Sequence, residues 1–278
     1  MRARRHIGVL IRHDLRYTLS SARGLLFLLF FVLFWSWVFS KLVGGFAERL
    51  GTMQGNLVVA WLYNNQVAQL FQQRSPTLVA YLVIATTLTP FAAMLASCDQ
   101  TASDLGTRRI RFLIPRVGRT EIFFARLISA ATLVTIAQIL AGLAAIIIAI
   151  IVAGKSGETG GEVATGAIIA YGAQVTGVLI VYSLPIVALM SLVSAAMASV
   201  GLALLVGLGG YAILGVALGL MPLEGTPATI VSFLVPSGLK PYFLQPELGP
   251  ALAACAGALG YIALYAFLGW QVFRRRDA

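Results

Sequence analysis

The sequence predicts an all-α integral membrane protein with six transmembrane helices preceded by an amphipathic interfacial helix. Three observations predict this class: 59% of the 278 residues are hydrophobic, only 11% are charged, and long uncharged runs recur along the chain. Soluble domains are about 45–50% apolar and about 25% charged, so this chain has too few polar side chains to cover a surface in water. The composition therefore excludes a soluble globular enzyme, a disordered protein and a disulfide-rich scaffold.

The apolar runs define a six-span transmembrane domain over residues 23–278, because each span needs about 20 mostly apolar residues. The predicted spans are about 24–43, 77–98, 127–153, 167–194, 200–221 and 250–273. The fourth and fifth share one uncharged run that is too long for a single helix, which predicts a tight turn near 194–201. The first run is expected to remain as an anchor, since its apolar core exceeds the roughly 7–15 residues of a cleaved signal peptide.

Residues 1–22 precede the first span and form the other part of the predicted organisation. Apolar residues recur there at helical spacing with basic residues between them: Ile7, Leu10, Ile11 and Leu15. This pattern predicts an amphipathic helix in the cytoplasmic membrane interface, with membrane lipids as its partner. Ser20 and Ser21 favour a break before the first span; the alternative is a helical extension of that span.

The charge is distributed unevenly, although the total of +10 could suggest a nucleic-acid partner. Fifteen of the 20 Lys and Arg residues lie before the first span, in segment 99–126 or at the C-terminus, whereas the acids divide evenly between the two sides. The positive-inside rule therefore places both termini and segment 99–126 in the cytoplasm. Orientation accounts for the basic excess, and no nucleic acid is expected as a partner.

Catalytic, metal-binding and ion-coupling groups are missing from the predicted spans. Both histidines precede the first span, no metal-ligand or nucleotide-binding motif occurs, and the span centres contain no Asp, Glu, Lys or Arg. We therefore expect no enzyme activity, no cofactor and no metal in this chain, and no ion coupling near the midplane. Cys98 and Cys255 are expected to be packed thiols. The neutral polar residues expected to form interhelical hydrogen bonds are Gln138, Gln174, Thr176, Tyr171 and Tyr182.

Segment 99–126 combines apolar and basic side chains, and Gly106 and Pro115 break it into short pieces. Apolar anchors among arginines are typical of a short helix that docks in a groove of a partner. The alternative is positive charge that rests against lipid headgroups.

The order of residues in this segment resembles the permease subunits of type-2 ABC exporters, including the six-span subfamily of the nitrous-oxide-reductase maturation permease. The family pattern has an acid before Gly-Thr, a hydrophobic pair, a proline, a small or polar residue followed by Arg, and a basic residue that opens the third span. The matching positions here are Asp104, Gly106, Thr107, Phe112, Leu113, Pro115, Gly118, Arg119 and Arg126. Arg126 stands where Lys is usual and Gly118 where Ser is common, and both substitutions keep the local chemistry.

The resemblance implies the transmembrane permease subunit of an ATP-driven exporter in the bacterial cytoplasmic membrane. A second permease copy, in a homodimer or heterodimer, and a separate nucleotide-binding ABC ATPase subunit would complete the transporter, with ATP and Mg held by that ATPase alone. Segment 104–121 would be the coupling helix seated on the ATPase. The implied docking residues are Asp104, Gly106, Thr107, Arg108, Arg109, Phe112, Leu113, Pro115, Arg119 and Glu121.

Other functions stay open from the residues alone. A stand-alone secondary carrier or channel is disfavoured by the uncharged span interiors, and a structural scaffold is not excluded. A membrane-embedded lipid enzyme would have to use Asp99 and Asp104, which lie near the interface and could hold a metal. Outside the membrane, segment 44–77 predicts a short polar-aromatic helix, and the proline-rich segment 222–250 predicts an ordered irregular loop.

Overall fold

The computed structural model describes residues 8–16, 22–42, 45, 49–50, 52, 54–55, 59, 65–107, 117–155, 162–220, 236–243 and 248–276. All regular elements within these ranges are helical, which confirms the all-α class. They are α2 (Ala22–Lys41), α5 (Asn65–Gln73), α6 (Pro76–Ser97), α7 (Ala102–Gly106), α9 (Arg119–Lys155), α10 (Glu162–Ala196), α11 (Val200–Leu220), η2 (Pro236–Leu239), α13 (Lys240–Phe243) and α14 (Leu248–Arg275). Residues 8–16 are also helical and precede α2.

Four helices, α6, α9, α10 and α14, are long and apolar enough to cross a membrane. This is the architecture of a membrane protein, as the composition predicts. Helices α2 and α11 occupy the two other predicted spans, and shorter apolar stretches lie within them, at Phe31–Lys41 and Val200–Leu214. The turn predicted near 194–201 lies between the end of α10 at Ala196 and the start of α11 at Val200.

Helix α9 begins at Arg119 and not near residue 127, where its apolar run begins. The N–H of Ile122 already donates to the carbonyl of Gly118, and Glu121 lies in the first turn, where a negative charge favours the helix dipole. The end of a charge-free run marks a change of side-chain polarity, but it does not stop a helix. The helix therefore begins before the predicted span, and the bounds of the span within it stay a prediction.

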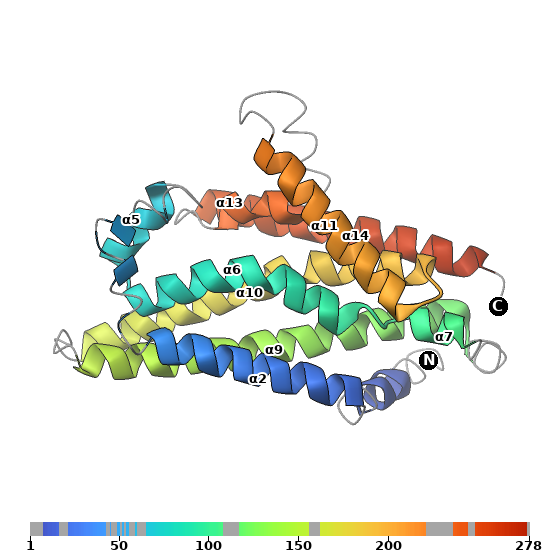
Figure 1. The fold of residues 1–278 in the computed structure, drawn as a ribbon, viewed down its shortest axis with the longest axis horizontal. Coiled ribbons are helices and arrows are strands. Elements are labelled where there is room, and N and C mark those ends of the chain that lie inside the picture. Colours follow the sequence, from blue (N-terminus) through green and yellow to red (C-terminus); the bar gives the residue numbers. More distant parts are fainter. Residues whose placement is uncertain are drawn as a thin grey trace.

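Helix α10 forms the centre of the bundle, because it packs against α6, α9, α11 and α14 (Figure 1). Three glycines permit close approach along this helix. A Cβ atom at Gly142 of α9 would collide with Thr176, one at Gly172 would collide with Ile146, and one at Gly207 of α11 would lie 2.5 Å from Met190 Sδ. Small residues at these crossings allow the backbones to pack closely, which is how helices associate in lipid.

Polar side chains between the helices behave only in part as predicted. Gln138 Nε2 donates to Thr89 Oγ1 at 3.1 Å and joins α9 to α6, and the hydroxyls of Tyr182 and Tyr211 are 3.5 Å apart between α10 and α11. Thr176 differs from the prediction, because its hydroxyl donates to the carbonyl of Gly172 in its own helix. A hydroxyl can satisfy itself locally in this way without a neighbouring helix.

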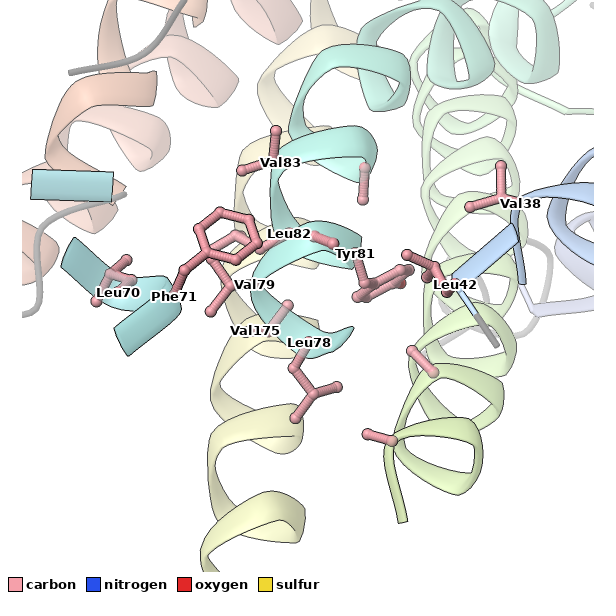
Figure 2. Close-up of a cluster of buried hydrophobic side chains, with 14 of the residues drawn as sticks. Val38, Leu42, Leu70, Phe71, Leu78, Val79, Tyr81, Leu82, Val83 and Val175 are labelled. Atoms are coloured by element: carbon pink, nitrogen blue, oxygen red, sulfur yellow. The ribbon is translucent and has the colours of Figure 1, made fainter. Parts of the chain in front are cut away.

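The two cysteines are free, as predicted, and Cys98 is buried. The polar helix predicted within 44–77 is present as α5, which packs against α6. Figure 2 shows the buried cluster around α6, with Leu70 and Phe71 of α5 on one side and Val38 and Leu42 on the other. In this cluster the side chain of Tyr81 is fully buried.

The described part of the 222–250 connection, η2 and α13, enters the bundle. Leu239 and Phe243 are buried in one apolar cluster with Ile186 of α10, and Leu239 packs on Gly257 of α14. Lys240 lies between these two anchors and is half-buried. From the sequence, Lys240 is expected among the charges on the side opposite the termini. The structure shows that its neighbours Leu239 and Phe243 belong to the packed interior.

We predict that Gly269→Val destabilises the fold, because a Cβ there would lie 3.0 Å from Phe123 Cζ and 3.1 Å from Leu192 Cα. Overpacking of this kind costs about 1–3 kcal/mol. The matched control is Gly260→Val in the same helix, where a Cβ meets nothing within 4 Å. Thermal unfolding in detergent should show a lower Tm for the first variant, and equal Tm values would contradict the packing described.

Candidate functional site

The candidate site is the end of the bundle that holds α7. The helical segment 8–16, the turn between α10 and α11 and the end of α14 lie at this end, whereas α5 lies at the opposite one (Figure 1). We call these the α7 end and the α5 end. The α7 end contains the described part of the segment in which the sequence predicts a partner-binding site.

Helix α7 is a single short helix held by local hydrogen bonds. The N–H of Leu105 donates to the carbonyl of Thr101, and the N–H and hydroxyl of Thr107 both donate to the carbonyl of Ser103. Asp104 lies in its first turn and is buried, whereas Gly106 and Thr107 are exposed. The helix therefore has one face turned into the protein and one turned outward.

Arg126 of α9 joins α7 to the segment 8–16. Its Nη2 donates to Asp104 Oδ2 at 2.6 Å, and its Nη1 donates to Asp14 Oδ1 at 2.8 Å. Both carboxylates are buried, and the arginine side chain is only 23% exposed. The planar guanidinium suits this role, because it can serve two acceptors in fixed directions.

The electrostatics of this cluster are unbalanced, because one guanidinium serves two carboxylates. The pKa of Asp14 is raised above its usual value, chiefly because burial disfavours the charged form, and the nearby Asp104 adds to the effect. The attraction of Arg126, and of His13 whose Nδ1 lies 3.8 Å from Asp14 Oδ1, acts in the opposite direction but does not outweigh burial. The Asp14 and Asp104 carboxylates therefore repel each other, and the positive charge of Arg126 offsets this repulsion.

Helix α7 is also tied to α10 and to the turn before α11. The hydroxyls of Thr101 and Ser194 are 3.1 Å apart, and Gln100 Nε2 donates to the carbonyl of Val187 at 3.2 Å. Gly106 lies so close to the carbonyl of Ala198 that a Cβ atom would collide with it. A glycine is required at this position for α7 to rest on the turn.

The C-terminal end of α14 is fixed to its neighbours by two arginines. Arg119 Nη1 donates to the carbonyls of Arg274 and Arg276, both at 2.8 Å. Arg276 in turn donates to the carbonyls of Ala195 and Ala196 at the end of α10. Cations here satisfy carbonyls that have no partner within their own helix and favour the helix dipole. The ends of α9, α10 and α14 are thus held together.

The structure describes five of the ten predicted docking residues, and their surroundings differ. Asp104 and Arg119 bind partners within the chain, Thr107 is exposed, and Glu121 is half-buried. Gly106 is exposed on one side and packs on the turn with the other. The remaining predicted residues lie outside the described part of the chain: Arg108, Arg109, Phe112, Leu113 and Pro115.

Sequence reasoning missed Asp14 and Arg276. Asp14 is three residues after Ile11 and four after Leu10, so it lies on the apolar face of its helix. A lone acid on an apolar face signals a buried partner, and this pattern could have identified it. Arg276 gave no such signal, because a basic tail is also what the positive-inside rule predicts.

The cluster is a set of ion pairs that holds separate elements together. Arg126 occupies the Asp104 carboxylate that a lipid enzyme would need for a metal. Across the residues that the structure describes, no group of three or more His, Cys, Asp or Glu side chains could hold a metal ion. The arrangement supports mechanical connection of three elements, segment 8–16, α7 and α9.

A family model described as "Protein of unknown function (DUF2705)" matches residues 52–278. The chain belongs to the DUF2705 family. No curated protein matches it significantly. The matched range of this DUF2705 protein includes Asp104, Arg126 and Arg276, whereas Asp14 precedes it.

We predict that Arg126→Gln lowers the free energy of unfolding of the DUF2705 protein by about 3–5 kcal/mol, because it leaves two buried carboxylates uncompensated. Asp14→Asn should cost much less, since the amide oxygen still accepts from Arg126 and the repulsion with Asp104 disappears. Arg275→Gln, at an exposed position near the same end, is the control. Thermal unfolding in detergent ranks the variants, and an Asp14→Asn loss as large as that of Arg126→Gln would refute the shared-arginine account.

The raised pKa of Asp14 also predicts a pH effect. A carboxyl with a folded pKa above its unfolded value near 3.8 releases its proton on unfolding, so the stability it contributes falls as pH rises through that window. Loss of Arg126 removes an interaction that lowers this pKa and should widen the window. The Tm deficit of Arg126→Gln relative to wild type should therefore shrink as the pH is lowered from 7.5 toward the unfolded pKa near 3.8. A deficit that stays constant or grows would contradict the repulsion between the carboxylates.

Proposed function

We propose that this protein is the six-span permease subunit of an ATP-driven transporter, an exporter, with α7 as part of the element that contacts a separate ATPase subunit. The observation that carries the proposal is the set of connections of α7. This single short helix is joined to segment 8–16 and α9 through Asp14, Arg126 and Asp104, and to α10 and α11 through Ser194 and Ala198. A force applied to α7 reaches all of these elements.

The direction of the connections supports coupling to an outside subunit. The inner face of α7 is occupied by internal partners, and Thr107, which directly follows α7, is exposed. The motif at 108–116 comes next in the sequence. Interface helices commonly use apolar anchors among basic residues, which this motif supplies in Phe112 and Leu113. A helix that is fixed inside and exposed outside can transmit motion without making an active site of its own.

The topology supports the same function. Six helices fall at the predicted spans, and the segment before α2 and the end of α14 lie together at the α7 end. The sequence contains no phosphate-binding G-x-x-x-x-G-K-[ST] motif. We therefore assign ATP hydrolysis to a partner ATPase and the membrane path to this chain together with a second permease copy in the cytoplasmic membrane.

Purification of the tagged full chain from its native membrane tests the proposal. We expect a subunit with a G-x-x-x-x-G-K-[ST] motif to co-purify, and the Arg109→Glu/Leu113→Asp double variant to lose at least tenfold of it, because the change reverses a charge and places a carboxylate at an apolar anchor. Arg275→Glu is the matched control, since it reverses an exposed charge at the same end.

Two results would overturn the proposal. One is a double variant that inserts into the membrane and retains its ATPase subunit at the wild-type ratio. The other is ATP-independent flux in liposomes that contain this chain alone, which would favour the stand-alone carrier or channel.

A further inference from the structure

The helix at residues 8–16 has one face turned to the protein and one turned away. Leu10, Ile11 and Leu15 are half-buried and Asp14 is buried, on the side where Arg126 and α9 lie. The exposed side chains are spaced three or four residues apart and so share the opposite face. They are Val9, Arg12, His13 and Arg16. The apolar residues that predicted insertion into the interface are therefore used partly to pack this helix on the bundle.

Hydrogen bonds to α9 fix the position of this helix along the length of the bundle. Arg126 binds Asp14, and Ser129 Oγ donates to the carbonyl of Ile11 at 3.2 Å. Arg126 is the last charged residue before the uncharged stretch 127–154 of α9. Segment 8–16 therefore lies where α9 changes from charged to apolar, which is the level of lipid headgroups for a membrane-spanning helix.

The exposed charge at the α7 end is of one sign. Among the side chains that the structure describes there, the exposed ionisable ones are Arg12, His13, Arg16, Arg274 and Arg275. The acid of segment 8–16 is removed from this surface, because Asp14 is buried against Arg126. The helix at residues 8–16 contains both acidic and basic residues, but only its basic side chains are exposed.

We propose that the exposed face of Val9, Arg12, His13 and Arg16 is a binding surface for anionic phospholipid headgroups. Its position at the polar boundary favours lipid over a soluble partner, and its charge complements the phosphate groups of anionic lipids. The two arginines donate to phosphate oxygens, and exposed Val9 contacts the acyl region beside them. Because Asp14 and Asp104 both accept from Arg126, the lipid surface is connected to α7 through that arginine.

The test compares lipids that differ only in headgroup. The purified full chain in dodecyl maltoside is titrated with dioleoyl phosphatidylglycerol or dioleoyl phosphatidylcholine, and bound lipid is counted by native mass spectrometry. Wild type should prefer phosphatidylglycerol. Arg12→Gln/Arg16→Gln should reduce affinity for phosphatidylglycerol by about 25-fold, from roughly 1 kcal/mol per basic residue, and leave phosphatidylcholine binding unchanged.

Arg274→Gln/Arg275→Gln is the matched control, because it removes the same number of exposed charges from the same end of the bundle. It should retain the preference, as should Asp14→Asn, since Asp14 does not reach the surface. A preference that survives Arg12→Gln/Arg16→Gln, or an equal loss in the control, overturns the proposal. The proposal is also overturned if Arg12→Gln/Arg16→Gln loses a co-purifying ATPase subunit but keeps its lipid binding. An unchanged Tm of Arg12→Gln/Arg16→Gln separates lost binding from lost folding, and the lipid surface stands whether or not the chain transports anything.

Discussion

The structure of the α7 end depends on the shared ion pair of Arg126 with Asp14 and Asp104. Each of the three residues comes from a different element, so one guanidinium fixes segment 8–16 and α7 on α9. Two buried carboxylates near each other need a cation or a proton, since each repels the other and both lose hydration. The position of α7, the exposed basic face of segment 8–16 and the fit of Gly106 on Ala198 are all arranged around this constraint.

A different principle holds the helices in the bundle. In lipid there is no water to drive apolar helices together, so close packing must supply the association. Glycines at 142, 172 and 207 bring α9 and α11 onto α10, and Gly269 brings α14 onto it. Arginines then close the α7 end, because Arg119 and Arg276 bind helix-terminal carbonyls that would otherwise lack a partner. Small residues thus allow close packing in the apolar middle, and arginines hold the helix ends together at the α7 end.

These two principles suit a protein that transmits motion. The middle is closely packed, and α7 is connected to its neighbours through directional polar contacts. The lipid surface proposed on segment 8–16 is connected to the same ion-pair cluster, because Asp14 belongs to that segment and binds Arg126. A transporter built this way would sense its ATPase through α7 and its membrane through Arg12 and Arg16.

The sequence by itself determined the class, the helices and the connecting turns, because hydrophobic runs and charge are properties of the chain alone. It placed the turn after Ala196 and the free cysteines correctly, but the uncharged run did not mark where α9 begins, since side-chain polarity does not end a helix. Only the tertiary structure decided the partners. It brought Asp14 to Arg126, gave Arg119 to the end of α14 and packed the anchors beside Lys240 into the interior. The first two contacts join residues about 110 and 155 positions apart. A local pattern, such as the apolar face around Asp14, can signal that a charge is buried, but it does not say which distant charge is its partner.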